Sequence, residues 1–357
     1  MNKIKFIIIL ENISNSESVK VTAEKICRAL KRPFLFMRNE IFLTTSIGIS
    51  IFPNDGKDIT DLMRHADSAM FNAKVSRDGF CFYKPGMEMV MSRRLEMERE
   101  LRKGIEQDEL RLFYQPKVDL KNASLVGAEA LLRWQHPVKG LIGPDEFVPL
   151  AEESDLIEEL NRWVLDQGIK QLGHWVSSGY YLTLALNLSL KGPIVRQLKN
   201  TIPALIRDYQ LPRGVLELEV TESTLISQPE LIVSELSKIR GLGVRIALDD
   251  FGSGYSSLNH LKQLPVDVLK IDRLFIKDIE TDPHDESIVK SIVCLARDLN
   301  MQTVAEGVET DRQRQILKKL KCDTYQGYLA SVPISAIEFE EQFLMQGNGN
   351  KNLIDKT

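Results

Sequence analysis

Polar side chains follow the apolar runs of this sequence at regular intervals between residues 110 and 330. Each run of valine, leucine, isoleucine or alanine leads into a carboxylate, an amide or an amine. The polar residues in these positions are Glu129, Asn187, Glu219, Asp249 with Asp250, Lys270, Glu306 and Gln326. If the apolar runs are parallel strands of a barrel, their carboxyl ends meet at one rim, and we expect these side chains to converge there.

The expected convergence includes five carboxylates, which repel one another. Two unit charges about 4 Å apart repel by roughly 4 kcal/mol at an effective dielectric constant near 20. Some carboxylates are therefore protonated, or divalent cations lie among them. Oxygen donors without histidine or cysteine favour Mg²⁺, Mn²⁺ or Ca²⁺ over zinc. The adjacent Asp249 and Asp250 could serve two ions, and ions about 3.5–4 Å apart activate water for attack on a phosphodiester.

Other interpretations of these residues stay open at this point. A single acidic residue after a strand is usually a helix cap or a solvated side chain. The glycine-rich segment 249–254 is by itself a weak indication of a phosphate-binding loop. Lys270 could instead be a Schiff-base amine in a barrel enzyme of another class. The sequence has no P-loop, GxGxxG or HExxH motif, and its five histidines are too far apart to form a local ligand motif.

The elements that must position these residues follow from periodicity. Short apolar runs alternate with amphipathic stretches from residue 110 to about residue 343. The amphipathic stretches predict helices near 154–176, 193–208, 229–240, 285–299 and 311–320. Strand–helix alternation over about 235 residues is typical of an α/β fold of the barrel type.

The first 85 residues have a different pattern and predict a separate α/β domain. We expect a strand at 6–10, a helix at 18–31, a strand hairpin around 37–51 with its turn at 38–40, a helix at 58–76 and a last strand at 80–85. Residues 86–108 are rich in glutamate and arginine. Pairs such as Glu98 and Arg102, four residues apart, predict a linker helix there.

Length, charge and cysteine content restrict the class of protein. A chain of 357 residues corresponds to about two domains. A net charge of −4 and a pI near 5.9 argue against a binder of polymeric nucleic acid or of anionic membranes. Four cysteines without CxxC spacing indicate a reducing, cytoplasmic setting. The apolar run 6–10 is shorter than a signal sequence requires, and no stretch approaches the roughly 20 apolar residues of a membrane span.

Seven motifs, in this order, resemble the EAL-domain cyclic di-GMP phosphodiesterases. They are GAEALLRW at 127–134, NLS at 187–189, EVTE at 219–222, DDFG at 249–252, KID at 270–272, EGVE at 306–309 and QGY at 326–328. The resemblance covers about residues 106–345, and we place the domain at 109–345 with a polar tail at 346–357. It implies hydrolysis of cyclic di-GMP to linear pGpG with Mg²⁺ or Mn²⁺, two ions being expected. It also implies a TIM-type (β/α)8 barrel whose first strand runs antiparallel.

The resemblance assigns the polar residues to roles at the metal ions. The residues that match ligands of the first ion are Glu129, Asn187, Glu219 and Asp249, and Asp250 matches a ligand of the second. Lys270 matches the residue that contacts the attacking water or the phosphate. Glu306 matches one that holds the second ion or its water.

Other matches concern the substrate and the surrounding loops. Gln115 and Arg133 match positions that contact the substrate, with Arg133 facing phosphate. Gln326 would help to place the metal-site residues, and Glu222 would support the DDFG loop. One departure from the family pattern is Val332 before Pro333, where a basic residue is usual.

Residues 1–85 resemble the C-terminal part of a GGDEF, or diguanylate cyclase, domain. The matching segments are TTSIGISIFPNDG at 44–56 and LMRHADSAMFNAK at 62–74. Phe6 aligns with the last letter of the signature, so residues 2–5 (Asn-Lys-Ile-Lys) stand where Gly-Gly-Asp-Glu would be. We therefore expect no cyclase activity. An incomplete domain exposes a sheet edge, so we expect it to be marginal alone and to lean on a partner chain or on the linker helix.

Family resemblance also implies a homodimer, and it leaves one alternative for the barrel. Barrels of this family can bind the dinucleotide and relay a signal without cleaving it. That alternative, a non-catalytic cyclic di-GMP receptor, usually shows the loss of a metal ligand or of the DDFG loop. This sequence retains both.

Overall fold

The computed structural model describes residues 5–13, 15–36, 39–41, 45–76, 78–190, 194–221, 229–252, 261–262 and 264–345. The chain divides into two compact units, Met1–Glu100 and Leu101–Thr357. Helix α3 (Met87–Glu106) contains the boundary between them. The domain limits at residues 85 and 108 stay predictions, and the tail at 346–357 lies outside the described residues.

The first unit combines helices with short strands. Helices α1 (Ser16–Leu30) and α2 (Ile59–Ser76) accompany a parallel pair of strands, β3 (Ile47–Ile49) and β4 (Phe80–Phe82). Asn15 caps α1 by accepting a hydrogen bond from the Ser18 amide, and Asp58 accepts one from the Asp61 amide at the start of α2. Val19, Ala23 and Ile49 form a small buried core. The predicted helices and the strand near residue 80 therefore form where the sequence places them.

Two expectations for the first unit are wrong. Residues 6–10 form no strand, although they are described, and their side chains are exposed, by 83% for Phe6 and 75% for Ile9. A β-branched run needs a neighbouring strand to bond its backbone, and the described residues pair none with it. The hairpin also differs from the expectation: β1 (Phe34–Phe36) pairs with β2 (Asn39–Ile41), which starts inside the predicted turn. The expected second strand of the hairpin forms β3, which pairs parallel with β4 instead.

The second unit contains a closed barrel, as the sequence predicts. Strand β5 (Leu110–Asp119) pairs antiparallel with β6 (Leu125–His136). From β6 the parallel order continues through β8 (Thr183–Asn187), β9 (Leu216–Thr221), β10 (Arg245–Phe251), β11 (Val268–Ile271), β12 (Gln302–Ala305) and β13 (Thr324–Tyr325). Strand β13 then pairs antiparallel with β5 and closes the ring. Among the described residues, these eight strands form a TIM-type barrel whose first strand runs antiparallel.

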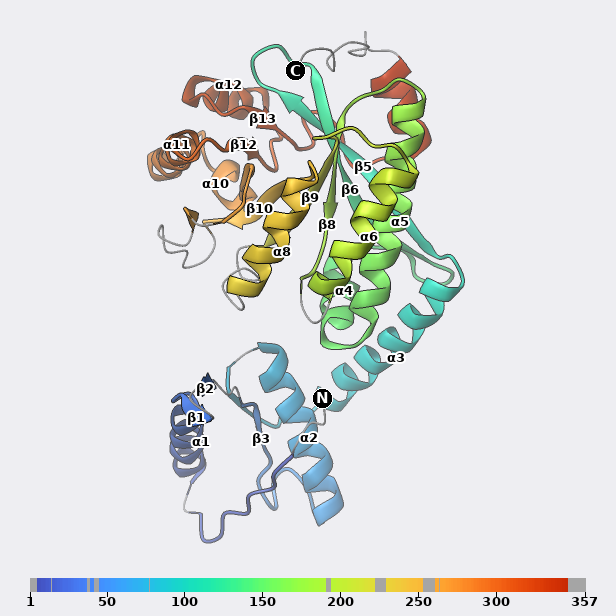
Figure 1. Cartoon of the computed structure of the whole chain (residues 1–357). Coiled ribbons are helices and arrows are strands. Elements are labelled where there is room, and N and C mark those ends of the chain that lie inside the picture. The colour runs from blue at the N-terminus through green and yellow to red at the C-terminus, as the bar shows by residue number, and fades with distance from the viewer. Residues whose placement is uncertain are drawn as a thin grey trace. The chain divides into compact units, whose positions relative to one another are not determined.

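Helices cover the outside of the barrel strands (Figure 1). The five predicted helices are α5 (Leu156–Ser177), α6 (Ile194–Asp208), α8 (Pro229–Gly241), α11 (Pro283–Asp298) and α12 (Asp311–Leu320). Shorter elements add to them: α4 (Pro144–Glu153), α10 (Arg273–Lys277), α13 (Ala336–Phe339) and the π-helix η1 (Glu340–Met345). No described helix is both long and apolar enough to span a membrane.

Strand β6 does not end at Glu129, contrary to the expectation for a rim residue. It continues to His136, because the antiparallel partner β5 supplies hydrogen bonds as far as Trp134. The short strand β7 (Gly140–Ile142) then pairs with this extension. The β5–β6 hairpin therefore projects beyond the level at which the parallel strands end.

The alternation of inward-facing and outward-facing residues along β5 decides which of its side chains enter the barrel. Tyr114 points outward and is buried against Trp175 and Phe339, with ring centroids 5.2 and 6.2 Å away. Fully burying one aromatic side chain contributes about 1.5–3 kcal/mol. Because successive strand residues face opposite sides, the anchored Tyr114 directs its neighbours of opposite parity, Gln115 and Lys117, into the barrel.

Candidate active site

Charged side chains from the four strands β5, β6, β9 and β11 meet inside the barrel and form a buried charged array. The members of this array are Lys117, Glu129, Glu217, Glu219 and Lys270, each at most 4% exposed. Glu217 and Glu219 are two residues apart on β9, so they share the inner face. Strand register places Glu219 opposite Asn187 of β8, and Glu129 opposite Gln115 of β5.

Lys270 is the centre of the array. Its Nζ lies 2.5 Å from Glu219 Oε2, 2.7 Å from Glu306 Oε1, 3.1 Å from Asp249 Oδ1 and 3.5 Å from Glu129 Oε2. Burial favours the neutral amine, but the surrounding carboxylates outweigh it and hold the pKa of Lys270 well above its ordinary value. Since a Schiff-base lysine must react as a neutral amine, this environment argues against the carbonyl-enzyme alternative.

Lys117 is a second buried ammonium, which the sequence analysis did not single out. Its Nζ lies 2.8 Å from Glu217 Oε1 and 2.8 Å from Glu219 Oε1. Burial again opposes the charge, but Glu217 and Glu219 raise the pKa of Lys117 above its ordinary value. Its position two residues after Gln115, in a strand with apolar neighbours, is the signal that could have identified it. The expected repulsion among the carboxylates is therefore offset in part by two lysines.

The carboxylates at this site differ in how readily they bind a proton. Burial alone would favour protonated Glu219, but Lys117 and Lys270 lower its pKa to about 2. Burial and the nearby Glu219 raise the pKa of Glu129. Burial also raises the pKa of Glu306 to about 8, with Asp249 and Glu129 adding to it against the attraction of Lys270. Glu219 is thus a permanent anion, whereas Glu306 binds a proton readily in the metal-free protein.

Amide side chains hold Glu129 from two sides. Asn187 donates to Glu129 Oε1 at 2.6 Å, and Gln326 donates to Glu129 Oε2 at 2.7 Å. Gln326 also donates to Gln115 Oε1 at 2.8 Å, and Gln115 donates to the Ser331 carbonyl at 2.9 Å. Within the described part of the chain, the buried Oε1 of Gln326 accepts no hydrogen bond. An unsatisfied buried acceptor is consistent with a further donor, such as a water, bound at this place.

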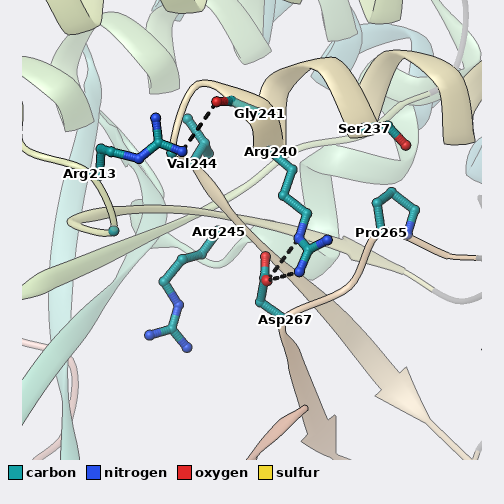
Figure 2. Close-up of a pocket in the computed structure, with 10 residues that line it drawn as sticks. Arg213, Ser237, Arg240, Gly241, Val244, Arg245, Pro265 and Asp267 are labelled. Carbon is teal, nitrogen blue, oxygen red and sulfur yellow. Dashed lines mark hydrogen bonds and ion pairs between the residues drawn. The ribbon is translucent and has the colours of Figure 1, made fainter. Parts of the chain in front are cut away.

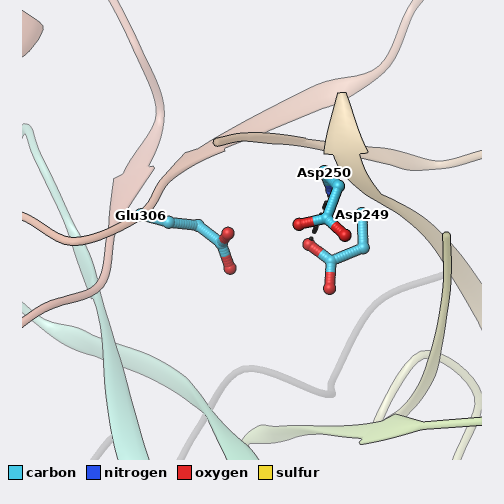
Figure 3. Close-up of side chains that lie close together, drawn as sticks. All are labelled: Asp249, Asp250 and Glu306. Atoms are coloured by element: carbon cyan, nitrogen blue, oxygen red, sulfur yellow. Dashed lines mark hydrogen bonds between the residues drawn. The ribbon is translucent and has the colours of Figure 1, made fainter. Parts of the chain in front are cut away.

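Asp249, Asp250 and Glu306 form an acidic cluster beside the array. Carboxylate oxygens of the three residues lie within 4.8 Å of one another, and Figure 3 shows them directed toward a common space. Asp250 has a left-handed backbone with a φ of 56°, and its amide donates to Asp249 Oδ1 at 3.0 Å. Clustered carboxylate oxygens without histidine or cysteine fit a divalent cation that prefers oxygen ligands, such as Mg²⁺ or Mn²⁺.

The structure brings nine of the predicted site residues together, and among the described residues it leaves Arg133 outside them. Those that lie together are Gln115, Glu129, Asn187, Glu219, Asp249, Asp250, Lys270, Glu306 and Gln326. Arg133, four residues beyond Glu129 on β6, donates to the carbonyl of Leu132, so its described contacts leave it outside the cluster. Glu222 lies outside the described residues.

A cavity of about 550 Å³ lies at the amino-terminal ends of β9 and β10 (Figure 2). Its lining includes Arg213, Arg240 and Arg245 but none of the predicted site residues. Arg240 bonds Asp267 at 2.8 Å, and Arg213 donates to the carbonyl of Gly241 at the end of α8. Arg240 and Arg213 therefore stabilise the segments that surround this cavity. The predicted site residues lie at the opposite end of the barrel.

Comparisons with known proteins agree with the two resemblances. The EAL domain family matches residues 98–333, and the diguanylate cyclase GGDEF domain family matches residues 2–79. The bifunctional diguanylate cyclase/cyclic di-GMP phosphodiesterase MucR of Pseudomonas aeruginosa is 39% identical over 334 residues, 93% of this chain and 49% of MucR. The cyclic di-GMP phosphodiesterase PdeR of Escherichia coli K12 is 36% identical over 340 residues, 95% of this chain and 51% of PdeR. The chain spans about half the length of these curated relatives.

Solved structures resemble the second unit. A PaMucR phosphodiesterase in complex with c-di-GMP is 41% identical, with a TM-score of 0.64 over 68% of this chain and 99% of that one. The EAL domain of Mycobacterium smegmatis DcpA is 34% identical, with a TM-score of 0.57 over 66% of this chain and 97% of that one. With the family match covering well over half of the residues, the chain belongs to the EAL domain family.

Proposed function

We propose that the barrel hydrolyses cyclic di-GMP to linear pGpG. The observation that carries this proposal is the acidic cluster of Asp249, Asp250 and Glu306 beside the Lys270 ammonium. The similarity to the PaMucR phosphodiesterase, solved with c-di-GMP, supports the choice of substrate. The names of MucR and PdeR support the choice of reaction.

We assign the reaction to Mg²⁺ or Mn²⁺, with two ions. Asp249, Asp250 and Glu306 would hold ions at the acidic cluster, and Glu129, Asn187 and Glu219 would complete the ligand set. Divalent ions in such a site supply an activated water and neutralise the charge on the phosphate. The all-oxygen donor set supports this choice of metal, since these ions prefer carboxylate and amide oxygens.

The chain's own groups orient the reactants. Hydrolysis to pGpG adds the oxygen of water to phosphorus and breaks one P–O3′ bond, and the released 3′ oxygen takes up a proton. Lys270 keeps its charge and can donate hydrogen bonds to a phosphate oxygen or to the attacking water. Preorganised donors of this kind stabilise the charge that develops in the transition state. Asn187 and Gln326 fix the two oxygens of Glu129, so this carboxylate presents one orientation to the site.

The two proposed substrate contacts, Arg133 and Gln115, differ in how many of their polar groups already form hydrogen bonds with described residues. Arg133 is half-buried, and within the described part of the chain its guanidinium donates to the Leu132 carbonyl. A guanidinium has five N–H donors, so it can also bind a phosphate. Gln115 already uses its amide nitrogen for Ser331 and its oxygen for Gln326. We therefore propose Arg133 as the phosphate contact, and Gln115 as a contact that must exchange a bond to reach the substrate.

An assay with cyclic di-GMP and Mg²⁺ tests the proposal directly. Purified protein should produce pGpG, detected by chromatography, and EDTA should abolish the product. Glu129→Ala should lose activity and keep the circular dichroism spectrum of the wild type. Glu286→Ala, an exposed carboxylate on α11, is the matched control and should retain activity. Folded wild-type protein that binds cyclic di-GMP with metal present but yields no pGpG would favour the receptor alternative.

Three further assignments belong to this proposal. A homodimer rests on family resemblance, and light scattering of the purified chain tests it. A cytoplasmic setting is supported by Cys27, Cys81, Cys294 and Cys322, which are free thiols. We propose no cyclase activity for residues 1–85, because the sequence lacks the GGDEF signature at 2–6.

A further inference from the structure

The buried charged array contains one cation that the reaction described above does not use. Lys117 is 3% exposed and sits between two carboxylates of the same strand face, Glu217 and Glu219, at 2.8 Å from each. Glu217 is in turn paired with Arg245, whose Nε lies 3.2 Å from Glu217 Oε2. A continuous row of alternating charges therefore runs from Arg245 through Glu217, Lys117 and Glu219 to Lys270.

The two oxygens of Glu219 have different partners. Oε1 accepts from Lys117, and Oε2 accepts from Lys270. Lys270 also contacts Asp249 and Glu306 of the acidic cluster. The described contacts of Lys117 join it to Glu217 and Glu219 instead. Oε1 is therefore held away from the cluster, and Oε2 is the oxygen on the cluster side.

We propose that Lys117 is a positioning residue that fixes the Glu219 carboxylate for metal binding and hydrolysis. The inference rests on the proposed function for the role of Glu219. Lys117 cannot follow a rotation of Glu219, because Glu217 holds the same ammonium. Groups that orient a metal ligand through its second oxygen typically change metal affinity or activity by about 10–100-fold when they are removed.

A purely electrostatic role for Lys117 predicts the opposite change. Removing a buried positive charge near a cation site should strengthen cation binding, since like charges repel. Removing a positioning contact should weaken it. The sign of the change in metal affinity on removal of the Lys117 charge therefore separates the two roles.

The experiment compares two variants at position 217. Glu217→Gln keeps Lys117 and its bond to Glu219, and the pair Lys117→Met with Glu217→Gln removes one charge of each sign. Both variants deprive Arg245 of the same partner, so they differ only at Lys117. Binding of Mn²⁺ alone is measured by isothermal titration calorimetry on metal-free protein, together with thermal unfolding in EDTA.

We expect the double variant to bind Mn²⁺ at least tenfold more weakly than Glu217→Gln, although it carries one positive charge fewer. Its kcat with cyclic di-GMP and Mg²⁺ should fall by a similar factor, while KM changes less than threefold. A difference in Mn²⁺ affinity below tenfold, or tighter binding, overturns the inference. If the methionine pair does not fold, Lys117→Gln with Glu217→Gln replaces it under the same criterion, since two neutral amides can bond each other in the buried site.

The two proposals fail in distinguishable ways. Wild-type protein that binds Mn²⁺ but never yields pGpG overturns the proposed function. The comparison of Mn²⁺ affinities between the two variants still decides the role of Lys117 in that case, because it requires no turnover.

Discussion

Glu306 and Lys270 come from the ends of neighbouring strands and are in direct contact, with Glu306 Oε1 2.7 Å from Lys270 Nζ. Glu306 directly follows β12, and Lys270 lies on β11, whose residue 270 is opposite Val304 in register. The pair joins the acidic cluster to the buried charged array. Its two members have different environments, since Lys270 is 1% exposed and the side chain of Glu306 is 20% exposed.

Replacing Lys270 should affect both activity and folding. Lys270→Met leaves four carboxylates without their shared ammonium. We expect turnover to fall by about 10²–10³-fold, and the metal-free protein to lose about 3–5 kcal/mol of stability, as for other broken buried ion pairs. Turnover assays and urea unfolding in EDTA measure these effects. Lys277→Met, on the exposed side of α10, is the control; equal losses in both variants would contradict the assignment.

The metal-free protein should become less stable as the pH rises from about 4.5 to about 8. The pKa of Glu306 rises from 4.5 to about 8 on folding, so the folded state binds this proton more tightly than the unfolded state in that interval. The slope is at most about 1.4 kcal/mol per pH unit for one proton. Thermal unfolding in EDTA between pH 5 and pH 9 measures it. Glu306→Gln should flatten the profile, and a wild-type profile that rises with pH would rule out this origin.

Asp250 should tolerate asparagine better than alanine. Its φ of 56° lies in the left-handed region, which asparagine and aspartate adopt more readily than other residues with a side chain. Both Asp250→Asn and Asp250→Ala should lose phosphodiesterase activity, because both remove a carboxylate from the acidic cluster. Only the alanine variant should also lose about 1 kcal/mol of stability, measured by urea unfolding. Equal stability of the two variants would show that the backbone at this position is not strained.

Limited proteolysis should cut the first unit before the barrel. Residues 6–10 are exposed and lie outside any described strand, and unpaired exposed backbone is where proteases act first. A time course with a broad-specificity protease, followed by mass spectrometry, should show cuts near Phe6–Leu10 while residues 110–340 stay intact. A proven monomer in which both units resist equally would count against this prediction and against the expected marginal stability of residues 1–85.

The barrel was predictable because its signals are local and repeated. Each strand ends near a polar residue, and the amphipathic stretches fix helix limits to within two residues, as for α12 at Asp311–Leu320. The strand predicted at residues 6–10 was wrong because the signal for it is isolated. A β-branched run indicates a strand only if a partner strand is present, and a single segment carries no information about its partner.

The buried charged array was only partly predictable. Glu219 and Lys270 lie where apolar runs end, so their positions indicate the rim. Lys117 lies within its strand, and its pairing with Glu217 joins residues 100 positions apart in the chain. Such a contact depends on how β5 and β9 face each other across the barrel interior. The extension of β6 beyond Glu129 has a similar cause, since it depends on β5 as a partner.

The reversed direction of β5 decides where the polypeptide enters the barrel. In a ring of strands that all run the same way, a preceding helix would arrive at the base, far from the carboxyl ends. Here Leu110 is opposite Trp134, on the part of β6 that projects past those ends. The chain that follows α3 therefore reaches the end of the barrel that holds the proposed active site first, five residues before Gln115. The first residue of the barrel therefore lies at the end where the parallel strands finish, and not at the end where they begin.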